Sequence, residues 1–584
     1  MTRFGKTSKL VAASLVGALA LTACSSDNGN DDGDSKDNGS GDGPSGTVTL
    51  AWGQPFDSYN NTTAGANSFA NVIVLNWVTT GFWQFAGEDG LLTPNEEFGT
   101  YEQTSEDPLV VEYTINDDAV WSDGESIDCD DFLLWWAQQS GKSPFSVIGS
   151  AGIEDTAVPE CEAGDKHFVL EYGTPYADWA ANGPSHGNTT MMPAHVVADQ
   201  GGISTDELIE AIKSEDWDAL EDAAEFFNNG WLIDGGLPDA ELIPSSGPYL
   251  LDSYEEGQHV TLKYNENYWG EAPATETIVI RQIAEPEMAQ ALENGEVDII
   301  APQPTVDMVE QINALSGINS QVGNGYTYEH LDFNFNEGPF SDNLALREAF
   351  ALCVPRQLIV DNLIKPVTPD APVKQIRNIA PWDPGFDEAN AHIAEELEQY
   401  GEQDIERARE ILEEEDAVGT TIKVQTLDNQ RRNDTGALIK DACDEAGFDV
   451  DFSATPDFFA TDGGLSQGTF DVAMFGWIGS SLISGWNSTF KTVEECTADG
   501  KGNNNGCYSN PEVDKLLQEV LVEADQETAL QMVAEIEKIL WQDLATIPIF
   551  QHPNITAWAE NVENIVPNPT QTGVVWNMPE WSKS

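Results

Sequence analysis

Apolar and polar residues alternate most regularly in the second half of the chain. Apolar residues recur every three or four positions in three segments, which predicts helices at 404–415, 435–445 and 527–544. Shorter apolar runs between these helices predict strands at 422–424, 448–452 and 470–477. The last run is almost entirely apolar, as expected of a strand buried on both faces. Strands that alternate with helices in this way predict an α/β fold with a substantially parallel sheet.

The first half of the chain contains fewer regular segments. Strands are expected at 47–52 and 109–115, with a polar loop at 53–67 after the first of them. Ser204 and Glu207 have the spacing of a capping box, in which each side chain bonds the other residue's backbone N–H. Apolar residues follow at helical spacing from Leu208 to Phe227, so we predict that a helix continues through this stretch.

The N-terminus has the pattern of an exported protein. Basic residues at positions 3, 6 and 9 precede an apolar stretch at 10–21, which is shorter than the roughly 20 residues that span a bilayer. The stretch ends in Leu-Thr-Ala-Cys24, which resembles a bacterial lipobox, whose cysteine is lipidated and becomes the mature N-terminus. Residues 25–46 consist of Ser, Asp, Asn and Gly with one Lys and one Pro, so they cannot form a core. We therefore predict a signal peptide at 1–23, a lipid on Cys24, a disordered tether at 24–46, and anchoring to the outer face of the cell membrane.

Composition limits the partners of the mature protein. The 584 residues include 25 basic and 101 acidic residues, and the formal net charge is −76. Such a surface repels nucleic acids and anionic membranes, so membrane contact is expected through the lipid alone. The body of the chain is too long for a single core, which predicts two or three domains.

Six cysteines follow Cys24, and an even number in an exported protein predicts disulfides. Cys496 and Cys507 flank a Gly- and Asn-rich loop that a local bridge would close. The pairs we predict are Cys496–Cys507, Cys129–Cys161 and Cys353–Cys443, although six cysteines allow other pairings.

Enzyme signatures are weak in this sequence. Gly183-Pro-Ser185-His186-Gly187 fits the G-x-S-x-G pattern of hydrolases, but that chemistry requires a strand before the serine and a helix after it. The flanking residues have neither pattern. The sequence contains no zinc-protease, C-x-x-C or Walker motif, so we predict no enzyme activity, no cofactor and no metal site.

Four blocks in the middle of the chain resemble the solute-binding proteins of ABC importers, specifically the dipeptide/oligopeptide-binding family known as family 5. The blocks are WSDG at 121–124 with DDF at 130–132, SGPY at 246–249 with YNENYWG at 264–270, ALENGEVD at 291–298, and FNFN at 333–336 with Pro339-Phe340, Asp342 and Arg347. Their order matches the family's order. Segments 94–102 and 105–109 are similar to an actinobacterial lipoprotein subgroup of the same family.

The resemblance implies a two-lobed periplasmic-binding-protein-like α/β fold of type II, in the large peptide-binding class, with an inserted subdomain and a hinged cleft. The expected divisions are lobe I at 47–72, 190–285 and 550–584, its inserted subdomain at 73–189, and lobe II at 286–549. The protein is expected to be a monomer.

The resemblance also implies a place for the ligand. Peptide-binding relatives carry an aspartate three residues after the tryptophan that corresponds to Trp477, and that carboxylate pairs with the peptide's α-ammonium. Ser480 stands at this position, and a hydroxyl cannot neutralise an ammonium. We expect Trp477, Ser480, Ser481 and Trp486 to form a ligand wall, and the further candidates are Trp52, Asn334 and Asn336.

Two functions are consistent with these patterns. In the first, the protein captures a peptide or another small polar solute and delivers it to an ABC permease with cytoplasmic ATPases. In the second, it is an envelope lipoprotein of the same fold that takes part in the assembly of cell-envelope glycolipids or polysaccharides without transport.

Overall fold

A mixed sheet of ten strands is the centre of the fold. The computed structural model describes residues 43–147, 152–383, 385–459, 463–479, 482, 484–493, 495–497, 503–523 and 525–584. Cys24, Ser480 and Ser481 lie outside these residues. The strand order is β13-β12-β14-β11-β15-β10-β1-β9-β8-β7. These strands are β1 (Thr47–Trp52), β7 (Tyr249–Glu255), β8 (His259–Tyr264), β9 (Thr277–Gln282), β10 (Ile299–Ile300), β11 (Ile318–Phe333), β12 (Thr421–Leu427), β13 (Asp449–Thr455), β14 (Val472–Ile478) and β15 (Thr546–Ala559).

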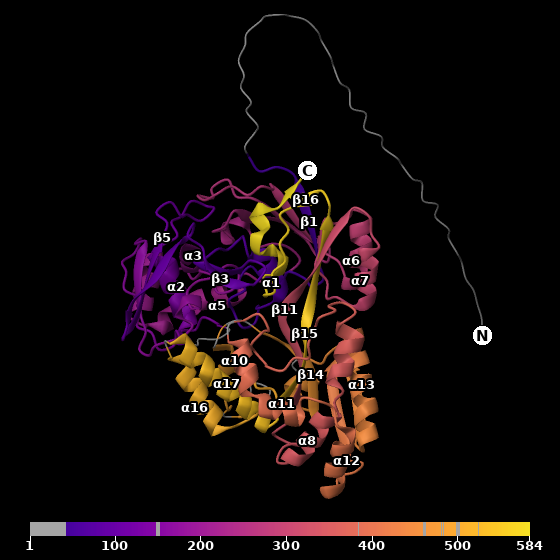
Figure 1. Cartoon of the computed structure of the whole chain (residues 1–584). Coiled ribbons are helices and arrows are strands. Elements are labelled where there is room, and N and C mark those ends of the chain that lie inside the picture. The colour runs from indigo at the N-terminus through magenta and orange to yellow at the C-terminus, as the bar shows by residue number, and fades with distance from the viewer. Residues whose placement is uncertain are drawn as a thin grey trace, which may run out of the picture. The chain divides into compact units, whose positions relative to one another are not determined.

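Two long strands, β11 and β15, connect the two lobes of the fold. They pair antiparallel along nearly their whole length, and they run down the middle of the molecule in Figure 1. One hydrophobic core contains Leu50 and Ile299 beside one end of these strands, and another contains Leu331 and Phe550 beside the other end. The chain therefore buries two main apolar cores around one shared sheet, as expected of a two-lobed α/β fold.

The sheet is less parallel than the sequence predicted. Strand β12 pairs parallel with β13 and β14, and β1 pairs parallel with β9 and β10. However, β11 is antiparallel to both of its neighbours, and β7, β8 and β9 form antiparallel pairs. The helical crossovers that parallel strands require are present only in parts of the chain.

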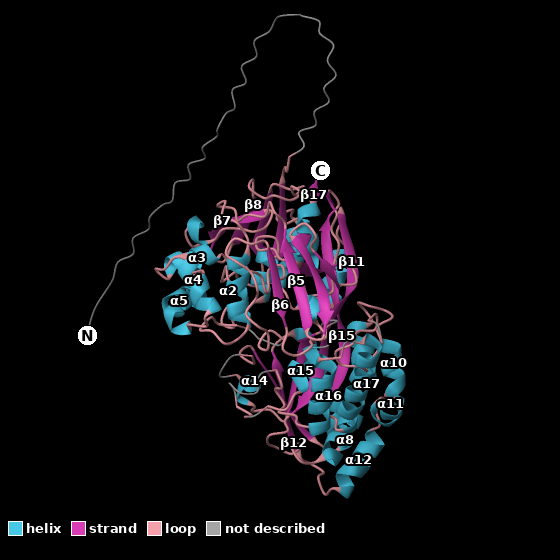
Figure 2. Cartoon of the chain, turned by 90° about the vertical axis from the view of Figure 1, so that its left-hand side faces the viewer, coloured by secondary structure: helices cyan, strands magenta, loops and turns pink. Residues whose placement is uncertain are grey.

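Most helices of the second half surround the strands at the lower end of the sheet in Figure 2. The predicted helices are confirmed as α12 (Ile405–Glu414), α13 (Gln430–Ala446) and α17 (Gln526–Gln542). The other helices from residue 285 onwards are α6 (Glu285–Glu293), α7 (Val306–Asn313), α8 (Leu344–Cys353), α9 (Arg356–Ile359), α10 (Phe386–His392), α11 (Ala394–Tyr400), α14 (Gly464–Gln467), α15 (Ser484–Phe490) and α16 (Pro511–Leu521). None of the helices in the described part of the chain is long and apolar enough to span a membrane.

The first half contains smaller sheets beside the main one. Its remaining strands are β2 (Trp83–Ala86), β3 (Leu91–Pro94), β4 (Gly99–Glu106), β5 (Leu109–Ile115) and β6 (His167–Glu171), and a short pair near the C-terminus is formed by β16 (Val562–Glu563) and β17 (Ser582–Lys583). Its helices are α1 (Phe69–Leu75), α2 (Cys129–Gln139), α3 (Ala194–Gln200), α4 (Thr205–Lys213) and α5 (Glu221–Asn229). Strand β5 has the predicted bounds, and its alternate side chains Val111, Tyr113 and Ile115 are buried as predicted.

The prediction that one helix continues to Phe227 is wrong, because two separate helices cover this stretch. The capping box of Ser204 and Glu207 is present, but α4 ends at Lys213. Glu215 has a φ of 54°, a left-handed conformation that no regular helix accommodates. The chain then passes through a short 3₁₀ turn at Trp217–Leu220 into α5, which buries Ala223 and Phe227.

All three predicted disulfides are confirmed. Cys129–Cys161, Cys353–Cys443 and Cys496–Cys507 are bonded, with sequence separations of 32, 90 and 11 residues. The first joins α2 to the segment before β6, and the second joins α8 to α13.

Candidate functional site

A cavity of about 500 Å³, here called the main cavity, is lined by residues from both halves of the chain. Trp52 and Phe69 come from the first half, and Arg432, Phe459 and Gly476 come from the second. The rings of Trp52 and Phe69 stack at 5.3 Å and are nearly parallel. The Trp52 Nε1 atom is buried and finds no hydrogen-bond partner among the described residues. A ligand in this cavity would meet a flat aromatic wall.

A smaller cavity of about 290 Å³, the side cavity, shares Thr570 with the main cavity. Ser185, His186 and Gly479 line it, and Gly479 directly precedes Ser480. The Ser185 hydroxyl bonds the Thr189 hydroxyl at 2.9 Å, and His186 Nε2 lies 2.9 Å from Asn95 Nδ2. Ser185 and His186 therefore bond other partners, and neither lies in the strand-to-helix turn that a nucleophile requires.

A buried carboxylate organises the charged side of the main cavity. Glu329 on β11 is 1% exposed and accepts hydrogen bonds from Arg432 Nε at 2.7 Å and Arg432 Nη2 at 3.2 Å. His552 Nε2 lies 2.8 Å from the same carboxylate. Burial by itself raises the pKa of Glu329, but Arg432 and His552 together hold it well below its usual range. Glu329 is therefore ionised and fixes Arg432 at the cavity wall.

The hydrogen bonds of His552 determine its protonation state. Arg431 Nη2 lies 3.0 Å from His552 Nδ1, and a guanidinium can only donate. Nδ1 therefore accepts, and Nε2 carries the proton that it donates to Glu329. Burial and the nearby Arg431 lower the pKa of His552 to about 4, so the imidazole is neutral at pH 7. The cluster of Glu329, Arg431, Arg432 and His552 therefore carries two positive charges and one negative charge.

We expect the free energy of unfolding to fall as the pH drops from about 6.5 to about 4. Burial lowers the pKa of His186, which is 3% exposed, to about 4, whereas in the unfolded chain it is near 6.5. Between these values the unfolded state binds more protons, so acid favours unfolding. Each pKa unit corresponds to about 1.4 kcal/mol, so the loss from His186 between pH 6.5 and 5 should be about 2 kcal/mol.

Urea unfolding across this pH range tests the expectation with two variants. His186→Gln should show a flatter pH dependence than the native protein. His167→Gln is the matched control, because the His167 side chain is 53% exposed, and it should leave the profile unchanged. Identical profiles for the native protein and His186→Gln would contradict a buried neutral imidazole.

The predicted tryptophans have different environments. Trp52 lines the main cavity. Trp477 is not among the lining residues: it stacks on His330 at 5.7 Å and packs against Phe475, although its neighbour Gly476 does line the cavity. Trp486 is 2% exposed and packs beside Phe490 in the second core, so its environment is that of a core residue.

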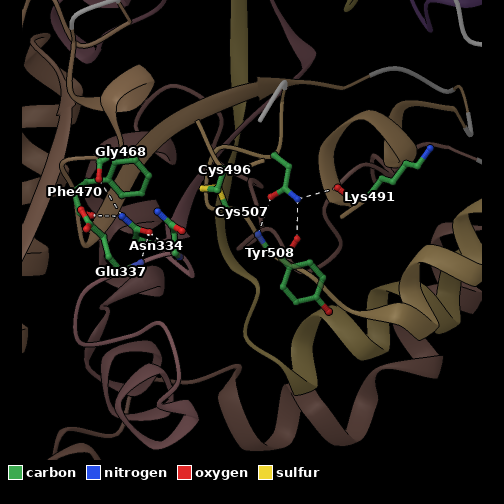
Figure 3. The surroundings of a disulfide bond; sticks show 10 residues. Asn334, Glu337, Gly468, Phe470, Lys491, Cys496, Cys507 and Tyr508 are labelled. Atoms are coloured by element: carbon green, nitrogen blue, oxygen red, sulfur yellow. Dashed lines mark hydrogen bonds between the residues drawn. A yellow bond between two sulfur atoms is a disulfide. The ribbon is translucent and has the colours of Figure 1, made fainter. Parts of the chain in front are cut away.

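Asn334 and Asn336 lie at the other end of β11 from the main cavity. Asn334 donates to the carbonyls of Gly468 and Phe470 and accepts from the N–H groups of Asn336 and Glu337, which Figure 3 shows near the Cys496–Cys507 bridge. Thr327, which lines the cavity, precedes Asn334 by seven residues of extended chain, or about 20 Å. Asn334 therefore closes a turn in this structure. Ser480 and Ser481 lie outside the described residues.

Glu329, Arg432 and His552 are not among the site residues predicted from the sequence. These residues are separated by more than 100 positions along the chain and form no motif. A partial signal is present, because Glu329 and His552 each interrupt a stretch of strand-forming residues, where a polar side chain requires a buried partner.

Comparison with known proteins identifies the family. The model of the bacterial extracellular solute-binding proteins, family 5, matches residues 77–489. The chain belongs to this family. Members bind solutes, so the protein is a binding protein and not an enzyme, as the sequence predicted.

Several relatives cover most of the chain. An uncharacterized lipoprotein of Mycobacterium leprae is 28% identical, over 98% of this chain and 96% of its own length. The oligopeptide-binding protein OppA of Mycobacterium tuberculosis is 24% identical, over 82% of this chain and 75% of its own. Among solved structures, the periplasmic EDTA-binding protein EppA is 25% identical with a TM-score of 0.79, covering 93% of this chain and 97% of that one. The oligopeptide-binding protein AppA of Bacillus subtilis, with a nonapeptide, is 15% identical with a TM-score of 0.71 and covers 93% of this chain and 99% of that one.

Within the described ranges, no group of three or more His, Cys, Asp or Glu side chains could hold a metal ion. The main cavity offers aromatic stacking, hydrogen bonding, one fixed guanidinium and the carboxylates of Glu88 and Glu285.

Proposed function

We propose that this protein is the membrane-anchored binding component of an ABC importer and that it captures peptides or related polar solutes in the main cavity. The two lobes would close over the ligand and present it to a permease with cytoplasmic ATPases. The observation that carries the proposal is a cavity lined from both halves of the chain in a family 5 solute-binding protein. Relatives named as oligopeptide-binding proteins support a peptide ligand, and the EDTA-binding neighbour extends the class to small polycarboxylates.

The lining residues suit an extended ligand rich in amides. Trp52 and Phe69 can stack on a flat or apolar side chain, while Arg432 can meet a carbonyl or carboxylate oxygen. Trp477, Ser480 and Ser481 stay candidates, because Gly476 lines the main cavity and Gly479 lines the side cavity, while Ser480 and Ser481 lie outside the described residues. We also propose that the chain divides into lobe I, its inserted subdomain and lobe II at the boundaries given above, near residues 72, 190, 285 and 550.

Mass spectrometry of the ligand that co-purifies with residues 47–584 tests the function directly. Peptides released by denaturation of the native protein, and lost in Trp52→Ala, are the expected result. Leu232→Ala is a matched control at an exposed apolar residue, which should keep the ligand. A protein that releases no solute and binds neither peptides nor polycarboxylates in calorimetry would contradict the importer function.

We expect a free α-amino group to contribute little to peptide affinity, because Ser480 replaces the aspartate. Two carboxylates line the main cavity, Glu88 and Glu285, but Glu285 accepts the Gln303 backbone N–H and lies near Arg431. Acetylation of the peptide N-terminus should therefore change the dissociation constant by less than about tenfold.

Calorimetry with matched free and acetylated peptides gives the comparison. A loss of about a hundredfold on acetylation would assign the ammonium to another carboxylate. Glu285→Gln would then remove the difference between the two peptides, whereas Ser480→Asp should create one where none exists.

The mature protein should be retained at the membrane by a lipid on Cys24. The relatives named as lipoproteins and the extracellular family support this localisation. Cys24→Ser should release the protein into the medium or soluble fraction, as measured by fractionation and immunoblotting. Membrane retention equal to that of the native protein would contradict the lipid anchor.

A role in envelope assembly without transport is the second candidate. The observation in its favour is the likeness of segments 94–102 and 105–109 to the actinobacterial lipoprotein subgroup, and the similarity to lipoproteins of Mycobacterium is consistent with it. Lipid-linked or free glycans in the co-purified fraction, with no peptide, would favour this function over import.

A further inference from the structure

A third cavity, here called the rear cavity, shares no lining residue with the main cavity. It has a volume of about 610 Å³, within the range of small-molecule sites. Gln551 on β15 lines the rear cavity, and the next residue, His552, lines the main cavity. The Lys374 backbone N–H and the Arg356 guanidinium donate to the carbonyls of Ile549 and Pro548, so the rear cavity lies beside β15. The proposed import function gives this cavity no role.

Two buried cations line the rear cavity. Arg356 and Lys374 are each 3% exposed. Arg356 is fully occupied, since its guanidinium donates to the carbonyls of Lys374, Pro548, Tyr400 and Gly401 and to the Gln375 side chain. The donors of Lys374 are less fully occupied. Its ammonium donates to the Ile379 carbonyl at 2.7 Å and lies 5.3 Å from the centre of the Tyr328 ring. An ammonium has three donors, which leaves capacity for an anionic acceptor.

Within the described residues, no carboxylate pairs directly with the Lys374 ammonium. Arg356, Arg377 and Lys374 are the cations of this region, and Glu537 and Asp383 are the carboxylates that act on Lys374. Arg377 pairs with Glu537. Asp383 accepts from the Tyr326 hydroxyl and the Ala380 N–H. A third carboxylate, Glu402, also lines the cavity, so the formal charges of the region balance, but the Lys374 ammonium still has a single hydrogen-bond acceptor among the described residues. Burial lowers the pKa of Lys374 to about 7, as expected of a cation that lacks a close anion.

The same cavity contains two acceptors without donors. Gln551 Oε1 and Asn390 Oδ1 are buried, and neither has a hydrogen-bond partner among the described residues. The Gln551 amide nitrogen donates to the carbonyls of Gly325 and Thr327 on β11, which fixes the orientation of its oxygen. Buried polar atoms normally have partners, so these oxygens indicate a ligand or water with N–H or O–H groups. Pro372, Val373 and Phe386 supply an apolar wall.

We propose that the rear cavity is a second binding site, which takes a small carboxylic acid that also carries hydroxyl or amino donors. The carboxylate bonds the Lys374 ammonium, and the hydroxyl or amino group donates to Gln551 and Asn390. Because Gln551 also holds β11 and β15 together where their register shifts, the ligand contacts the strands that connect the two lobes.

Isothermal calorimetry on the exported protein with L-malate, L-glutamate and acetate tests the site. L-malate or L-glutamate should bind with a dissociation constant of about 1 mM or lower. Acetate, which has no hydroxyl or amino donor, should bind at least about tenfold more weakly. Binding should take up protons, so the measured heat should depend on the ionisation enthalpy of the buffer.

Variants separate this site from the main cavity and from surface effects. Lys374→Met should weaken binding of the acid by about tenfold or more, and Lys365→Met, at an exposed lysine outside the cavity, should leave it unchanged. Asn390→Leu keeps the side-chain size, removes one unpartnered oxygen and should also weaken binding if Lys374→Met does not fold. Trp52→Ala should bind the acid as the native protein does. No binding of L-malate or L-glutamate at about 10 mM, equal binding by Lys374→Met or Asn390→Leu, or loss of binding in Trp52→Ala would overturn the proposal.

Discussion

Glu537→Gln should lower the free energy of unfolding by about 3–5 kcal/mol, because it leaves a buried guanidinium without its counter-charge. The side chains of Arg377 and Glu537 are both fully buried, and the carboxylate accepts from Arg377 Nη1 and from the Arg377 backbone N–H at 3.2 Å. Arg377 also donates to the hydroxyl and the carbonyl of Thr546, both at 2.7 Å. Glutamine has nearly the same shape, so the substitution removes the charge with little change in packing.

Urea unfolding monitored by tryptophan fluorescence measures this effect. Glu519→Gln is the matched control, because Glu519 pairs with Lys515 on an exposed helix surface with side chains 44% and 69% exposed. Such surface pairs contribute about 0.5 kcal/mol or less. A loss below about 1 kcal/mol in Glu537→Gln would mean that the interior around Arg377 is hydrated or rearranges.

The ion pair also bears on the site, because Arg377 fixes the start of β15. Thr546 is the first residue of β15, and the same strand carries Gln551 to the rear cavity and His552 to the main cavity. A partly unfolded Glu537→Gln protein should therefore lose ligand at both cavities together, whereas Trp52→Ala affects the main cavity alone.

Elements with a local pattern could be predicted from the sequence. Segments 109–115 and 404–415 place their apolar residues at strand and helix period, and both form the predicted element within a residue or two. The break after α4 could not be predicted, because the apolar residues on both sides keep a helical spacing while Glu215 adopts a left-handed conformation. Strand β15 contains Pro548 and Pro553, which are unusual inside a strand, but both lie at shifts in the register with β11, and β10 pairs only with Ala557 and Trp558.

The site was predictable only where the family resemblance reached it. Trp52 was found because the family places the end of the first strand at the cleft, and it lines the main cavity. Glu329 and His552 meet through pairing between strands more than 200 residues apart, and Arg432 reaches them from helix α13, which no local pattern encodes. Their charges are also inconspicuous among 101 acidic residues.

The double variant Cys353→Ala/Cys443→Ala should lose about 4.5 kcal/mol of stability, the larger loss among the disulfides compared here. In the chain-entropy model, a bridge stabilises the fold by restricting the unfolded chain, and the effect grows with the closed loop. This bridge closes 90 residues, whereas Cys496–Cys507 closes 11. The variant Cys496→Ala/Cys507→Ala should therefore lose only about 3 kcal/mol.

In the Cys353→Ala/Cys443→Ala variant, the loss of stability should be concentrated at helix α13, which the Cys353–Cys443 bridge joins to α8. The same helix carries Arg431 and Arg432 near its first turn, so local opening of α13 would release the guanidinium that Glu329 holds at the main cavity. Hydrogen exchange should be faster along α13 in the Cys353/Cys443 variant than in the Cys496/Cys507 variant, with β1 and β9 equally protected in both. Ligand affinity at the main cavity should fall in the first variant and not in the second. Equal losses of stability in the two variants, or unchanged exchange along α13, would mean that packing alone holds this helix in place.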